Sequence, residues 1–105
     1  MNAVVGIDIG GTYTKFGIVD KKGQCLGMKT IATGQFPDVR QFQESLFHEI
    51  NNLMDTLGKD IKIKSVGIGA PNGNYYDGTI KHPPNLNWKG IVPFVKKFKK
   101  FYPDI

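Results

Sequence analysis

The residues best suited to chemistry lie in Asp8-Ile9-Gly10-Gly11-Thr12, close to the start of the sequence. A carboxylate is followed there by two glycines and a hydroxyl. The glycines permit positive φ and allow the backbone to come close to a ligand. Backbone N–H groups in such a turn can hold phosphate oxygens, and a neighbouring carboxylate suits a metal-bridged polyphosphate. The spacing therefore indicates a phosphate site beside a cation.

The residues before the turn have the composition of a strand. Val4, Val5, Ile7 and Ile9 form a short apolar run, which we expect to be buried on both faces. An unpaired carboxylate is costly in such a strand, so Asp8 is predicted to point into a cleft or toward a cation. The alternative is a tight hairpin in which Asp8 only caps the turn.

Hydrophobic spacing along the rest of the chain predicts an α/β fold. Three sequential strands joined by tight turns favour an antiparallel meander. Asp38 is a candidate N-cap for an amphipathic helix, and Gly58 is a natural stop for it. The predicted elements are strands over 3–9, 14–20 and 24–33, a helix over 39–57, a strand over 61–68, a short extension over 79–81, a loop over 82–90 and a second helix over 91–102.

A second pattern follows the fourth predicted strand. Gly67-Ile68-Gly69-Ala70-Pro71-Asn72-Gly73 ends that strand, and Pro84-Asn85-Leu86-Asn87-Trp88-Lys89-Gly90 lies in the next loop. The first segment comes near a dinucleotide fingerprint, but its third glycine is one place late and no helix begins there. Thr14-Lys15-Phe16 does not match a Walker loop, because no glycine precedes the lysine. Neither of these nucleotide folds is favoured.

Together the two motifs resemble the ROK family, which contains repressors and sugar kinases. Asp8-Ile9-Gly10-Gly11-Thr12 resembles the first phosphate motif of the actin-like ATPases, and Gly17-Ile18-Val19-Asp20 is especially similar to ROK. The loop at 84–90 resembles the Asn-Leu-x-Trp loop of ROK sugar kinases. The resemblance implies a ribonuclease H-like domain with a mixed sheet, in the order β-β-β-α-β-α. Residues 1–105 would be the N-terminal, smaller domain of a kinase, truncated before the fifth strand.

The resemblance also implies ATP and Mg²⁺ as cofactors and a hexose, most often glucose, as substrate. Asp8 would help to position Mg²⁺ through water, while Gly10, Gly11 and Thr12 would contact the β- and γ-phosphates. Lys15 is a further candidate for the cofactor site, although an outward-facing strand lysine is the more ordinary interpretation. N-acetylmannosamine or fructose as the sugar, and polyphosphate as the donor, stay open as alternatives.

On the sugar side, the resemblance points to Gly73, Asn74, Pro84 and Asn85. Asparagine amides both donate and accept hydrogen bonds, which suits sugar hydroxyls. The alternative is that these asparagines only form turns. Trp88 could stack on a sugar or attach the loop to the core, and attachment is the favoured hypothesis.

No residue is assigned as the general base that a sugar kinase needs. In ROK kinases this base is the aspartate of an Asn-Asp motif after the fifth strand, and no Asn-Asp pair occurs in the 105 residues. We therefore expect a piece of a longer kinase that is inactive alone. An uncovered edge on its fourth strand predicts self-association, and thus a homo-oligomer.

Composition and charge bear on the possible partners of the protein and on its cellular location. The net charge is +5, and much of it comes from the lysines of the last predicted helix, Lys96, Lys97, Lys99 and Lys100. A solvated helix face explains these lysines, while a binding module for nucleic acid or protein is the alternative. A sugar-responsive repressor is a further alternative, although no helix-turn-helix precedes the first strand. Cys25 is the sole cysteine, and neither a signal peptide nor a membrane span is expected, which favours the cytoplasm.

Overall fold

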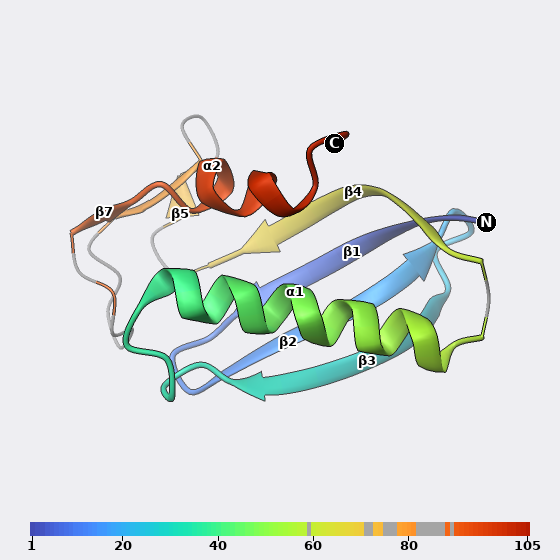
Figure 1. The fold of residues 1–105 in the computed structure, drawn as a ribbon, viewed down its shortest axis with the longest axis horizontal. Coiled ribbons are helices and arrows are strands. Elements are labelled where there is room, and N and C mark those ends of the chain that lie inside the picture. The colour runs from blue at the N-terminus through green and yellow to red at the C-terminus, as the bar shows by residue number, and fades with distance from the viewer. Residues whose placement is uncertain (59, 71–72, 75–77, 82–87, 89) are drawn as a thin grey trace.

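A mixed four-stranded sheet forms the centre of the computed structural model, which describes residues 1–58, 60–70, 73–74, 78–81, 88 and 90–105. Its strands are β1 (Asn2–Ile9), β2 (Tyr13–Asp20), β3 (Cys25–Ala32) and β4 (Lys62–Gly69). Their order is β3-β2-β1-β4, with β1 antiparallel to β2 and parallel to β4 (Figure 1). The α/β class and the meander of the first three strands are confirmed.

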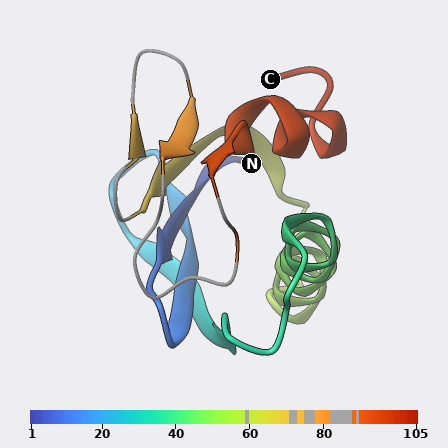
Figure 2. The same cartoon turned by 90° about the vertical axis from the view of Figure 1, so that its left-hand side faces the viewer.

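β1 is buried on one face only, so the prediction of a strand buried on both faces is wrong. Val5 and Ile7 are 1% and 4% exposed, whereas Val4, directly before them, is 38% exposed. This alternation continues along the whole strand and is typical of a sheet with one solvated face. Among the described residues, both helices lie on the same side of the sheet (Figure 2). Asp8 consequently lies on the open face.

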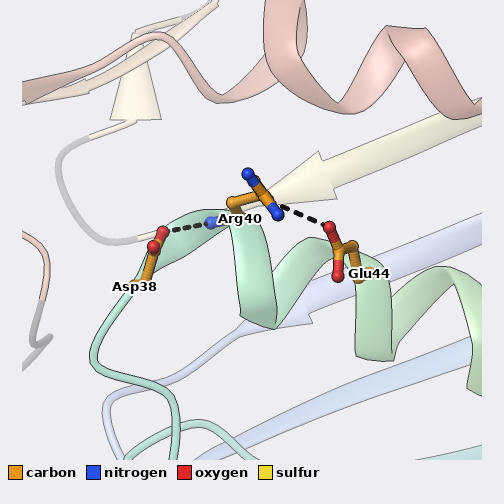
Figure 3. Close-up of polar contacts among 3 residues, drawn as sticks. All are labelled: Asp38, Arg40 and Glu44. Carbon is orange, nitrogen blue, oxygen red and sulfur yellow. Dashed lines mark hydrogen bonds and ion pairs between the residues drawn. The ribbon is translucent and has the colours of Figure 1, made fainter.

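The helix α1 (Val39–Thr56) covers the buried face, as its hydrophobic spacing predicts (Figure 2). The carboxylate of Asp38 caps it by accepting the N–H of Arg40 at 2.8 Å, and Arg40 Nε lies 3.1 Å from Glu44 Oε1 (Figure 3). Just beyond the last turn, Gly58 has a φ of 62°. Each buried apolar side chain of the helix contributes about 1.5–3 kcal/mol. The side chains with no exposed surface are Phe42, Leu46 and Ile50.

In the part of the chain that the structure describes, three short strands follow β4, where the sequence predicted a single extension. They are β5 (Gly73–Asn74), β6 (Thr79–Lys81) and β7 (Ile91–Val92), and they form an antiparallel sheet in the order β5-β6-β7. The extension over 79–81 is confirmed as β6. The predicted element order β-β-β-α-β-α therefore holds only as far as β4. Most of the predicted loop, residues 82–87 and 89, lies outside the described residues.

The second helix begins later than predicted. After β7 the chain forms α2 (Phe94–Phe98) and the 3₁₀ turn η1 (Lys99–Phe101). Proline disfavours the helical conformation of the residue before it, and Val92 is paired in β7, so the helix starts only after Pro93. The carbonyl of Pro93 accepts the N–H of Lys97 at 3.1 Å. As a result Ile91, predicted on the apolar side, is 60% exposed.

An aromatic cluster joins α1 to α2 and to the loop residue Trp88. The ring centroids of Phe42 and Trp88 are 4.9 Å apart, and those of Trp88 and Phe94 are 6.0 Å apart. Trp88 is 5% exposed, which agrees with its predicted role of attaching the loop to the core. None of the described helices is both long and apolar enough to cross a bilayer.

Candidate functional site

The predicted phosphate residues form a tight hairpin between β1 and β2. The N–H of Gly10 donates to the carbonyl oxygen of Tyr13 at 3.0 Å, which closes the turn. A Cβ on Gly10 would lie 2.6 Å from that same oxygen, so a side chain there would force the strands apart. Positive φ, the reason given from the sequence, is wrong for this pair of glycines. The described glycines with positive φ are Gly23, Gly58, Gly78 and Gly90.

Two backbone donors in the hairpin are open. Among the described residues, the N–H groups of Gly11 and Thr12 have no hydrogen-bond partner, and the Thr12 side chain is exposed. The carbonyl of Thr12 is engaged, because it accepts the N–H of Thr33 at 2.9 Å. The three predicted phosphate residues thus differ in what they can do. Gly11 and Thr12 have donors to offer, whereas the N–H of Gly10 is used to shape the turn.

Asp8 and Lys15 lie directly opposite each other on the open face of the sheet. They are register partners in the β1–β2 ladder, and both are exposed. Side chains in such a pair have Cβ atoms about 4.5–5.5 Å apart. Within the described part of the chain, the ion pairs are Lys29–Glu49 and Arg40–Glu44, so Asp8 and Lys15 are not tied to each other. The carboxylate and the ammonium are therefore both available to a ligand.

On its other side, Asp8 lies beside a glycine of β4. Its register partner there is Gly69, and a Cβ on Gly69 would lie 4.0 Å from Asp8 Oδ1. In phosphotransfer sites Mg²⁺ is usually held by one or two carboxylates, by phosphate oxygens and by water. An exposed carboxylate beside open N–H groups fits that donor set. In the described part of the chain, no three His, Cys, Asp or Glu side chains gather as a metal site of their own.

The predicted sugar residues are only partly placed. Gly73 is exposed, opens β5, and donates its N–H to the carbonyl of Ala70 at 3.2 Å. Asn74 is the second residue of β5. Pro84 and Asn85 lie outside the described residues. Whether the four residues meet at one site therefore stays a prediction.

A cavity of about 1040 Å³ opens between β4 and α2. Its walls are mostly apolar, with Val66 and Ile68 on one side and Phe98 on the other. Gly69 and Gly73 also line it, so the cavity reaches both a predicted sugar residue and the strand position beside Asp8. The cavity is large enough for a small molecule, but it lies on the helix side of the sheet and Asp8 is not among its lining residues.

Tyr102 is a polar group on the wall of this cavity. Its hydroxyl is buried and has no hydrogen-bond partner among the described residues. Burial disfavours the charged phenolate and raises the pKa of Tyr102 to about 12. The ring packs against Phe47 and Phe98, with centroids 5.2 and 5.7 Å away. Tyr102 therefore stays neutral and keeps a hydroxyl hydrogen that it can donate.

Thr33 contacts the hairpin but was not identified from the sequence. Its hydroxyl lies 2.7 Å from that of Thr14, and both side chains are buried. The two residues are 19 positions apart, so no local spacing rule links them. The only available signal was the position of Thr33 as the last residue of a predicted strand.

A mixed sheet that carries a glycine-closed hairpin beside an exposed carboxylate defines the class of this protein. It is an α/β domain with a mixed sheet. Comparison with protein families gives the finer assignment, because the ROK family model matches residues 4–103. The chain belongs to the ROK family.

Individual relatives agree with this assignment. A glucokinase of Streptomyces coelicolor is 30% identical over 90 residues, which are 85% of this chain and 26% of the relative. A ROK family glucokinase from Streptomyces griseus, solved with glucose and AMPPNP, is 26% identical with a TM-score of 0.67, over 93% of this chain and 30% of its own. A ROK family transcriptional regulator, a homologue of the E. coli MLC protein, shares the fold at a TM-score of 0.76 and 17% identity. The match covers 97% of this chain and 26% of the regulator. The chain spans about a quarter of the curated relative's length.

Proposed function

We propose that this chain supplies the phosphate-binding side of a sugar kinase that transfers the γ-phosphoryl group of ATP to a hexose. The observation that carries the proposal is the hairpin, in which the N–H groups of Gly11 and Thr12 are open beside the exposed Asp8. The glucokinase relatives, one of them solved with glucose and AMPPNP, favour glucose as the hexose and ATP as the donor. In this proposal residues 1–105 form the N-terminal, smaller domain of a cytoplasmic kinase.

Each residue of the hairpin has a distinct role in the proposal. Gly11 and Thr12 donate backbone hydrogen bonds to phosphate oxygens, and Asp8 holds Mg²⁺ through water. Lys15, opposite Asp8, adds positive charge to the same face. When bound, Mg²⁺ neutralises charge on the transferred phosphoryl group. Sugar hydroxyls are held by Gly73 and Asn74 of β5 together with Pro84 and Asn85.

A titration of the ¹⁵N-labelled chain with MgAMPPNP tests the proposal. The amides of Gly11 and Thr12 are expected to shift more than any amide of β3. Asp8→Asn should remove the dependence of this shift on Mg²⁺, because the carboxylate that holds the hydrated ion is gone. Asp55→Asn is the matched control, since Asp55 is exposed near the end of α1. Unchanged hairpin amides in the unmodified chain at saturating MgAMPPNP would refute the proposal.

Turnover is expected to be absent from these 105 residues alone. The sequence holds no Asn-Asp pair, so we assign no catalytic residue to it. A coupled assay with glucose and ATP should give no product above background. Measurable phosphorylation of glucose would show that the chain contains a base that this proposal lacks.

A second candidate function is sugar-responsive transcriptional regulation, or nucleic-acid binding more generally. One observation favours it: every lysine of α2 and η1 is exposed, namely Lys96, Lys97, Lys99 and Lys100. The similarity to the ROK regulator supports the fold alone, because its identity is 17%. Binding to DNA that weakens steeply with salt, without any binding of MgAMPPNP, would favour this function.

We also expect two copies to associate through β4. Among the described strands β4 pairs only with β1, so its outer N–H and C=O groups are open to strand addition. The apolar cavity lies along the same strand. Sedimentation equilibrium at high concentration measures the association. A purely monomeric profile would contradict it.

A further inference from the structure

Thr33 contacts the phosphate hairpin at two separate points. Its backbone N–H donates to the carbonyl oxygen of Thr12 at 2.9 Å. Its hydroxyl lies 2.7 Å from the hydroxyl of Thr14. Thr14 is the first residue of β2 whose side chain faces the core. Thr33 is 2% exposed and Thr14 is fully buried. Thr33, which follows β3, is thus hydrogen-bonded both to the turn and to β2.

The contacts restrict the part of the hairpin that carries the open donors. The bond from Gly10 to Tyr13 closes the turn at its base, and the bond from Thr33 fixes the carbonyl of Thr12 at its tip. The peptide units with the open N–H groups of Gly11 and Thr12 lie between these two bonds. Donors that are held in place before a ligand arrives lose less entropy when it binds.

The hydroxyl pair determines whether Thr33 can hold this position. Each hydroxyl of Thr14 and Thr33 is buried, so water cannot replace a lost partner. The chain also turns directly after Thr33, whose carbonyl accepts the N–H of Phe36 at 3.3 Å. The side chain of Thr33 is therefore the anchor that keeps its own N–H aimed at Thr12.

We propose that Thr33 is a positioning residue for nucleotide binding: through its hydroxyl bond to Thr14 it holds the phosphate hairpin in the conformation that receives phosphate oxygens. The proposal rests on the proposed function, because it assigns the ligand of the hairpin as a nucleotide phosphate. Thr33 does not itself contact the ligand. Its contribution passes through the carbonyl of Thr12.

A set of matched variants separates positioning from stability. Thr33→Val keeps the shape but deletes one hydroxyl, and Thr33→Ser keeps the hydroxyl. The double variant Thr14→Val with Thr33→Val deletes both hydroxyls, so that no buried hydroxyl is left without a partner and the stability lost in Thr33→Val should largely return. Because this double variant still lacks the bond that orients Thr33, its affinity for the nucleotide should stay low.

The experiment measures three quantities on each variant: the dissociation constant for MgAMPPNP, the free energy of unfolding in urea, and the hydrogen exchange of the Gly10 and Thr33 amides without ligand. Thr33→Val should weaken MgAMPPNP binding about five- to tenfold, the size of one lost neutral hydrogen bond, and speed exchange at both amides. Thr33→Ser should restore affinity and slow exchange. The double variant should recover stability but not affinity.

The outcomes also distinguish this inference from the proposed function. If the unmodified chain does not bind MgAMPPNP, the proposed function fails, and positioning for nucleotide binding fails with it, whatever the exchange rates are. If the unmodified chain binds but Thr33→Val binds equally well, the inference alone is overturned. The inference is also overturned if affinity simply follows stability, so that the double variant binds like the unmodified chain.

Discussion

The side-chain amide of Gln43 on α1 donates to the backbone carbonyl oxygen of Phe94 on α2, at 3.0 Å and across 51 positions of sequence. Gln43 is 2% exposed, so this bond is made inside the core. It joins the helix that covers the sheet to the helix that walls the cavity. The position of α2 over β4 therefore depends on a polar contact as well as on aromatic packing.

Gln43→Met is expected to lower the free energy of unfolding by about 1 kcal/mol, because it keeps most of the volume and deletes the hydrogen bond. Gln41→Met on the same helix is the control, since Gln41 is exposed. Urea denaturation followed by circular dichroism measures both. Equal stability of the two variants would contradict the role given to this bond.

Gly10→Ala is expected to destabilise the hairpin by about 1–3 kcal/mol, because its Cβ would lie 2.6 Å from the carbonyl oxygen of Tyr13. Gly6→Ala, in the strand β1 that leads into the turn, is the matched control. A Cβ on Gly6 would meet nothing within 4 Å, so this change should be neutral or stabilising. Thermal unfolding compares the two, and an unaffected Gly10→Ala protein would show that the turn accommodates a side chain.

Asp38→Ala is expected to cost about 1 kcal/mol of stability, because the first turn of α1 loses the acceptor for the N–H of Arg40. Asp38→Asn and Asp38→Ser keep an oxygen at this position and should retain most of the stability. Chemical denaturation of the three variants measures the difference. A loss of equal size in all three would mean that capping is not the cause.

Glu49 and Lys29 make a contact between α1 and β3 that should depend on pH. The hydrogen bond from Lys29 holds the pKa of Glu49 below its usual value of 4.5, even though partial burial opposes this. Because the pKa of Glu49 is lower in the folded state, its carboxylate stabilises the folded state at pH values above the pKa of the unfolded chain. This stabilisation is lost as the pH falls through the pKa of the folded state. Lys29→Met should cost about 0.2–1 kcal/mol at neutral pH, because the pair is partly exposed, and almost nothing by about pH 2.

Urea denaturation of the unmodified chain and of Lys29→Met at both pH values measures the effect of this pair. Lys21→Met, in the exposed turn after β2, is the control and should show no such difference. A cost for Lys29→Met that stays constant with pH would contradict an ionic origin.

Tyr102→Phe is expected to stabilise the protein slightly, because it removes a buried hydroxyl that has no partner among the described residues. The ring contacts with Phe47 and Phe98 are kept. Burial raises the pKa of Tyr102 to about 12 from 10.0. The contribution of the neutral phenol to the free energy of unfolding is therefore full below the unfolded pKa, and it is lost as pH rises through the folded pKa. The gain from Tyr102→Phe should thus grow between pH 10.0 and about 12 in thermal melts.

The elements that local rules specify were predictable from the sequence. Asp38 and Gly58 mark the ends of α1, because a cap and a left-handed stop act within one turn. The strands of the meander were found within about two residues, since alternation and turn residues are also local signals. The hairpin turn after Asp8 was predictable for the same reason, although the backbone donors that it leaves open were not.

The remaining features depend on contacts that are distant in sequence. Val4 is exposed because no described helix covers that face of the sheet, which an apolar run cannot reveal. The hydroxyl pair of Thr14 and Thr33 exists only after β2 and β3 have paired. Pro93 is different, because it was a local signal in the sequence. The prediction followed the apolar spacing from Ile91 onward instead, and this spacing favoured a longer helix than a proline allows.

The two partners of β1 come from very different distances along the chain. β2 begins directly after the hairpin turn, whereas β4 begins at Lys62, 53 positions after β1 ends at Ile9. Pairing of distant segments is slow, because the intervening chain must be ordered before the contacts form. The expected folding transition state has the meander assembled and β4 still detached. The molecule would then acquire the turn between β1 and β2 before the cavity beside β4 exists.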